Sequence, residues 1–110
     1  ALADQDEKRR SEQVESLNRL VRSGPPEARL VATGALSRRD DLDVVPTLIF
    51  ALSDPDPRVV KQARDGLRFI SRKFEGFGLA DEPTLDAKLA AIEKWKTWYK
   101  TIRPDAQFEK

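Results

Sequence analysis

Two aspartates separated by one proline, Asp54 and Asp56, are the residues whose type and spacing most suggest chemistry. Paired carboxylates could share acid and base roles, or hold a hard cation such as calcium or magnesium. A cation site needs further oxygen ligands, and the turn from Ser53 to Pro57 has no third carboxylate. The structural alternative is that Asp54 opens a turn and that Asp56 caps the helix starting at Pro57. We predict the structural roles.

Other carboxylates are weaker candidates for catalysis. Three aspartates between Asp40 and Asp43, and the pair Asp81-Glu82, precede expected helices, where carboxylates act as caps. Asp65 is the best placed carboxylate for excising a base, but two helical repeats leave little concavity for a flipped base. The chain has no Cys, His or Met, so thiolate and imidazole chemistry and nitrogen or sulfur metal ligands are absent. We expect no enzyme, no metal and no cofactor.

The composition is typical of one soluble helical domain. Of 110 residues, 39% are hydrophobic and 35% charged, and no apolar run is long enough to cross a membrane. The net charge of +1 gives no global attraction to nucleic acid or to anionic membranes, so any such attraction must be local. The start at Ala1 shows neither an initiator Met nor a leader, which suggests an excised domain or a processed product. The compartment stays open.

The apolar pattern repeats after 31 positions, a shift that takes Val14 to Val45 and the break at Pro26 to the break at Pro57. Apolar residues fall on apolar residues throughout this alignment. A period near this length is the signature of stacked helical hairpins. We therefore predict two antiparallel pairs of helices, at about residues 11–38 and 41–74.

The period breaks after Phe74. The next residues, 75–83, form a glycine-bearing connection with two apolar anchors, for which we expect a packed loop. Thr84 then caps a closing helix over about 84–103. Its apolar stripe, with Trp98 beside it, consists of Leu85, Leu89, Ile92, Trp95, Tyr99 and Ile102.

The segment from Val45 to Leu67, VPTLIFALSDPDPRVVKQARDGL, closely resembles a HEAT repeat. The proline in the first helix, the Asp-Pro-rich turn, the valine after it and the small residues carry the resemblance, which is close over 44–74 and weak over 11–38. The family often has Arg or Lys at the position of Val60 and Ala at that of Gly66, so the polar ladder between repeats is expected to be incomplete. The resemblance implies a right-handed stack of helix pairs that serves as a scaffold for proteins and, less often, nucleic acids. Enzymes are rare in such folds.

A basic face is predicted on the second helix of the second repeat. Residues 58–73 hold six basic side chains against Asp65 alone. Those at helical spacing, which share a face, are Lys61, Arg64, Arg68 and Arg72. Three interpretations remain open: a solvated surface, a docking face for an acidic protein or for the acidic N-terminal segment of the chain, and a phosphate-binding face.

The closing helix gathers both tryptophans and the single tyrosine between Trp95 and Tyr99. Trp95 and Tyr99 lie on the core stripe and are expected to close the end of the stack. Trp98 lies off that stripe, so it is a candidate anchor for a partner.

Together these patterns predict an all-α, short HEAT-like helical repeat of about five helices: two antiparallel hairpins and a closing C-terminal helix. Its expected function is noncatalytic protein binding or scaffolding within a larger, bacterial-type protein. The partner is another protein or another domain of the same chain; nucleic acid on the basic face is the alternative, and neither a membrane nor a small molecule is expected. The candidate partner-binding residues are Lys61, Arg64, Arg68, Arg72 and Trp98.

Overall fold

The computed structural model describes residues 2–39, 41–73, 79 and 83–105, with side chains described from Lys8 onward. All regular structure in this part is helical, which confirms the prediction of an all-α fold. The elements are α1 (Leu2–Ser23), α2 (Pro26–Ser37), the 3-10 helix η1 (Leu42–Val44), α3 (Val45–Ala51), α4 (Pro57–Ser71) and α5 (Leu85–Ile102).

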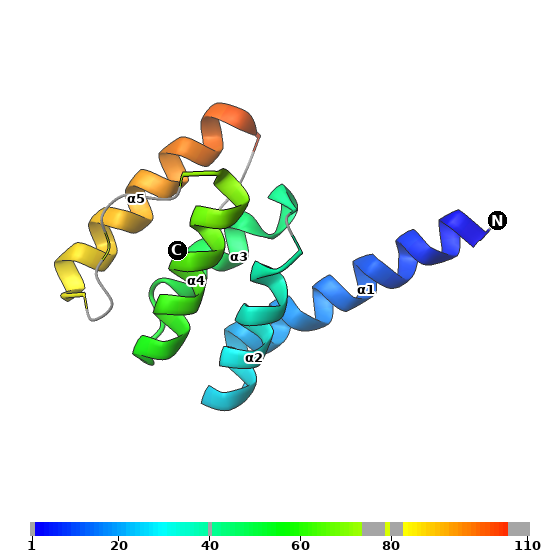
Figure 1. Ribbon diagram of the computed structural model, residues 1–110, viewed down its shortest axis with the longest axis horizontal. Coiled ribbons are helices and arrows are strands. Elements are labelled where there is room, and N and C mark those ends of the chain that lie inside the picture. The colour runs from blue at the N-terminus through cyan, green and yellow to red at the C-terminus, as the bar shows by residue number, and fades with distance from the viewer. Residues whose placement is uncertain (1, 40, 74–78, 80–82, 106–110) are drawn as a thin grey trace.

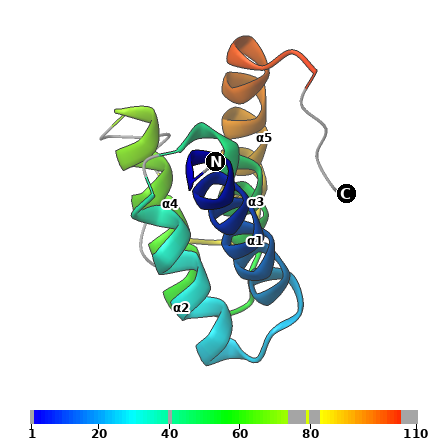
Figure 2. The ribbon, with the colours of Figure 1, turned by 90° about the vertical axis from the view of Figure 1, so that its right-hand side faces the viewer.

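The helices form two layers. Figure 2 shows α2 and α4 in one layer and α1, α3 and α5 in the other. Within this arrangement α1 packs on α2 and α3 packs on α4, as predicted for two successive hairpins, and α2 also packs along α4. The N-terminal half of α1 extends beyond the rest of the molecule (Figure 1).

Three of the predicted helix caps are present, whereas the candidates Asp40, Asp81 and Glu82 lie outside the described residues. In each, a side-chain oxygen accepts a hydrogen bond from a backbone N–H that the first turn would leave unpaired. The caps are Asp41 to the N–H of Asp43 at 2.9 Å, Asp56 to that of Arg58 at 3.0 Å and Thr84 to that of Ala87 at 3.1 Å. At its other end α4 stops at Ser71, because Arg72 adopts a left-handed conformation with φ of 62°. The helix thus ends three residues before Phe74, where the sequence pattern placed its end.

The first helix is longer than predicted. It begins at Leu2, whereas the apolar pattern places its start near Ser11. The added turns carry no apolar stripe, but their sequence sets acidic residues four positions before basic ones, as in Asp4 and Lys8. Such pairs stabilise a helix by about 0.2–0.5 kcal/mol each without any tertiary contact. Charge spacing therefore extends a helix that hydrophobic periodicity alone does not detect.

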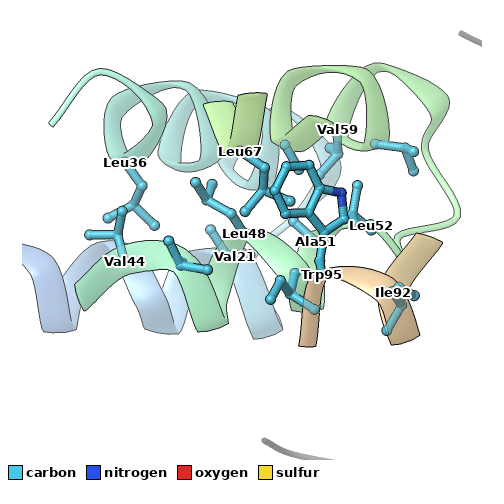
Figure 3. Close-up of a cluster of buried hydrophobic side chains, with 14 of the residues drawn as sticks. Val21, Leu36, Val44, Leu48, Ala51, Leu52, Val59, Leu67, Ile92 and Trp95 are labelled. Carbon is cyan, nitrogen blue, oxygen red and sulfur yellow. The ribbon is translucent and has the colours of Figure 1, made fainter. Parts of the chain in front are cut away.

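One core lies between the two layers (Figure 3). Each helix contributes at least one side chain that is essentially removed from solvent, so the closing helix belongs to the same core as the hairpins. Representative residues from α1 to α5 are Val21, Leu36, Leu48, Leu67 and Trp95.

The apolar stripe predicted for α5 is buried only in its middle. Ile92, Trp95 and Tyr99 are buried, and the prediction is wrong for three other residues. Those are Leu85, Leu89 and Ile102, which are 69%, 51% and 44% exposed. The helix packs on α3, which has 7 residues against 18 in α5, and at about 1.5 Å per residue α3 cannot cover its whole length.

Candidate functional site

The two aspartates that suggested chemistry have structural roles, as predicted. Asp54 is 6% exposed, and its carboxylate accepts hydrogen bonds from the backbone N–H of Asp56 at 2.9 Å and from Arg29 at 2.8 and 3.3 Å. Arg29 also donates to the carbonyl of Gly24 at 3.0 Å. One arginine therefore joins the turn of the first hairpin to the turn of the second.

This ion pair was not predicted from the sequence. Arg29 stands 31 positions before Val60, the position at which the second repeat lacks the basic residue that the resemblance leads one to expect. Another contact joins two residues that the repeat aligns. Arg58 stands 31 positions after Glu27 and donates a hydrogen bond to it at 2.7 Å. Residues aligned by the sequence repeat thus lie side by side in the stack.

Arg58 and Asp56 form an ion pair at the start of α4, in which the Arg58 side chain is 52% exposed and the Asp56 side chain 14%. The side chain and the backbone N–H of Arg58 both donate to the Asp56 carboxylate, and these bonds lower the pKa of Asp56 below its usual value. The hydrogen bonds to Asp56 and Glu27 raise the pKa of Arg58. These bonds favour the ionised form of Asp56, which caps the start of α4.

The predicted basic face is divided by the structure. Lys61 and Arg72 are exposed and Arg68 is half-buried, but Arg64 is buried. Arg64 donates to the carbonyl of Leu79 at 3.2 Å, and Arg68 donates to the same carbonyl at 3.3 Å.

The buried position of Arg64 corrects the expectation of four cations on one outer surface. Leu79 is itself buried. Arg64 and Arg68 therefore hold the chain at Leu79, between α4 and α5, and do not form a shared outer surface with Lys61 and Arg72. Arg64 also pairs with Asp65 at 2.9 Å, and this engages the carboxylate considered above for base excision. The remainder of the expected connection, with its second anchor Phe77, lies outside the described residues.

Trp98 is half-buried and packs at the edge of the core. Its ring meets that of Trp95 edge-on, with 5.6 Å between centroids, and lies 6.3 Å from that of Tyr99 at a tilt. Burial raises the pKa of Tyr99. The aromatic cluster thus closes the stack, and Trp98 keeps only part of its surface for a partner.

A groove runs between α2 and α4, with a volume of about 420 Å³. Its floor is shaped by the contact between Ser37 and Gly66: a methyl group added at Gly66 would lie 2.2 Å from the Ser37 hydroxyl oxygen. Only glycine fits there. The Ser37 hydroxyl donates to the carbonyl of Thr33 at 2.7 Å within α2, and it also lies 3.3 Å from the carbonyl of Gln62 on α4.

The rim of this groove carries an exposed aromatic ring between cations. Phe69 is 44% exposed and lines the groove together with Arg38, Asp65 and Gln62. The guanidinium of Arg72 lies over the Phe69 ring, 4.9 Å from its centroid. Sequence analysis missed Phe69 because it stands off the apolar stripe of α4; a large ring outside that stripe is the signal that could have found it.

No model of a protein family, no curated protein and no solved structure matches the chain. Within the described residues, no group of three or more acidic, His or Cys side chains is placed to hold a metal ion. Among the described helices, none is long and apolar enough to cross a membrane.

Proposed function

We propose that this chain is a noncatalytic protein-binding module built as a short HEAT-like stack, and that the groove between α2 and α4 receives a segment of the partner. The observation that carries the proposal is the exposed ring of Phe69 on the rim, between Arg38 and Arg72. Aromatic and arginine side chains dominate the energetically important positions of protein interfaces.

The groove is preferred to the outer basic face of α4. Arg64 and Arg68 are hydrogen-bonded to the carbonyl of Leu79, so they are partly or wholly committed to the fold. Lys61 and Arg72 alone make a small electrostatic footprint on a chain of net charge +1. Nucleic acid binding through this face is therefore the weaker proposal.

Selection of peptides tests the function without knowledge of the natural partner. A random peptide library is panned against the wild-type chain, and the enriched peptides are then measured against Phe69→Ser and against a matched control, Leu85→Ser. Both residues are exposed and apolar, but Leu85 lies on α5, outside the groove. We expect the enriched peptides to lose at least ten-fold in affinity on Phe69→Ser and to bind the control normally.

Two results would overturn the proposal. One is that no peptide is enriched over background. The other is that the enriched peptides bind Phe69→Ser as tightly as they bind the wild-type chain, while far-ultraviolet circular dichroism shows all variants folded.

A further inference from the structure

A second groove lies between α1 and α2, with a volume of about 640 Å³. Leu17 and Ala35 give it an apolar lining, and its charged residues are Arg9, Glu12 and Arg39. Ala35 and Arg39 face this groove, whereas Ser37 and Arg38 face the groove between α2 and α4. The C-terminal end of α2 is therefore a ridge with one groove on each side.

The ridge and its flanks carry an excess of positive charge. Arg38 and Arg39 stand at the top of the ridge, and Arg9 lines the second groove. Among the described residues no ion pair holds these three arginines. Two described carboxylates line the grooves, Glu12 and Asp65, and Asp65 is paired with Arg64.

We propose that the two grooves and the ridge form one surface that binds an acidic, extended peptide segment carrying two apolar residues. One apolar side chain enters each groove, and a carboxylate between them pairs with Arg38 and Arg39. This inference rests on the proposed function and specifies the chemistry of the partner. Arginine suits the role because its planar guanidinium binds carboxylates with two parallel hydrogen bonds.

The width of the ridge sets the spacing of the apolar residues in the peptide. A helix is about 10–12 Å across, and an extended chain advances about 3.3 Å per residue. Three to four residues therefore cross the ridge. Because side chains of an extended strand alternate, residues at positions i and i+4 point to the same side, and so does the acidic residue at i+2. The predicted sequence pattern is an apolar residue, an acidic residue two positions later and a second apolar residue two positions after that; acidic residues at the two positions between them add negative charge to the segment.

The same features favour a peptide over nucleic acid. Leu17, Ala35 and Phe69 offer apolar contact at intervals, whereas a nucleic acid backbone presents an unbroken row of phosphates. Glu12 and Asp65 stand within the grooves and would repel such a row, but a peptide can place its apolar residues beside them.

The test uses a labelled peptide with the core Leu-Glu-Glu-Glu-Leu between glycine-serine flanks, titrated with the full chain and followed by fluorescence anisotropy. A peptide with the core Leu-Gln-Gln-Gln-Leu and a single-stranded oligonucleotide serve as the two comparison ligands. The charge-reversal variant is Arg38→Glu/Arg39→Glu, and the matched control is Lys61→Glu/Lys94→Glu, which reverses two exposed charges elsewhere. Arg38→Gln/Arg39→Gln removes the charge more mildly, should the first variant fail to fold.

We expect the acidic peptide to bind the wild-type chain at least ten-fold more tightly than the glutamine peptide and the oligonucleotide. Its affinity should fall at least twenty-fold on Arg38→Glu/Arg39→Glu, less than three-fold on the control, and steadily with added salt. Equal binding of the two peptides, tighter binding of the oligonucleotide, absence of binding, or equal loss on both double variants would each overturn the inference. If one of these results is obtained but neutral peptides from the library still require Phe69, the inference about acidic peptides is wrong and the proposed protein-binding function stands.

Discussion

Replacing the buried carboxylate of the second turn, Asp54→Asn, should destabilise the whole fold. The Asp54 side chain accepts hydrogen bonds from Arg29 at 2.8 and 3.3 Å and from the backbone N–H of Asp56 at 2.9 Å. Asparagine keeps the size and can still accept the bond from Asp56, but it cannot neutralise the guanidinium. Arg29 is then left mostly enclosed without a counter-charge.

The size of the effect follows from the burial of Arg29. Removing one partner of a fully buried ion pair costs about 3–5 kcal/mol. The Arg29 side chain is 18% exposed and keeps its bond to the Gly24 carbonyl, so water and that carbonyl offset part of the loss. We expect the free energy of unfolding to fall by about 2–3 kcal/mol and Tm to fall by roughly 10 °C.

Urea and thermal unfolding followed by circular dichroism measure this change. The control is Glu27→Gln, which removes an exposed partner of Arg58 and should cost less than about 0.5 kcal/mol. Adding Arg29→Gln to Asp54→Asn should destabilise by less than the sum of the two single changes, because no uncompensated charge remains. If Asp54→Asn unfolds within about 0.5 kcal/mol of the wild-type chain, the pair does not hold the two turns together.

Three further predictions concern the contact between α2 and α4, the burial of Arg64 and the pH dependence of stability. Gly66→Ala should lower the free energy of unfolding by about 2–3 kcal/mol by forcing α2 and α4 apart, and added Ser37→Gly should recover part of it; loss without recovery in urea unfolding would contradict the close contact. Arg64→Ala should cost about 2 kcal/mol and Lys61→Ala less than about 0.5 kcal/mol, whereas equal costs would contradict the burial of Arg64. The raised pKa of Tyr99 means that the fold favours the neutral phenol, so this contribution is present below about pH 10 and is lost as pH rises through the folded-state pKa. Tyr99→Phe should therefore lose less stability than the wild-type chain between about pH 9 and 11 in urea unfolding, and identical losses would contradict the assignment.

The starts of α2, α4 and α5 could be predicted because their signals are local. The breaks at Pro26 and Pro57, and the capping residues Asp56 and Thr84, act within one turn of the backbone they fix. The 31-residue period likewise predicted the stacking, and the contact between Glu27 and Arg58 shows aligned positions meeting in space.

The remaining features depend on neighbours that periodicity does not reveal. Leu85 and Leu89 have the spacing of core residues, but the short α3 does not reach them. Arg64 has the spacing of an outer face, but the chain returns over it at Leu79. Arg29 and Asp54 are 25 residues apart, and nothing in either segment shows that the two turns approach each other.

The candidate groove also depends on contacts between helices that periodicity does not reveal. Its floor requires Gly66 to meet Ser37, a contact between α2 and α4 that the sequence indicates only through the small size of these residues. Its rim combines Phe69 with Arg38, which come from different helices. A site made of residues from two helices can be identified only when the packing of those helices is known. A run of basic residues can be identified in the sequence, but the fold can bury some of its members, as it buries Arg64.

The most direct test of partner binding in the groove is a map of backbone amide chemical shifts, recorded as the isotope-labelled chain is titrated with the tightest peptide from the random library. Binding in the groove predicts the largest changes at Ser37, Gln62 and Phe69, with little change along α5. Largest changes around Trp98, or changes spread evenly over the chain, would contradict it.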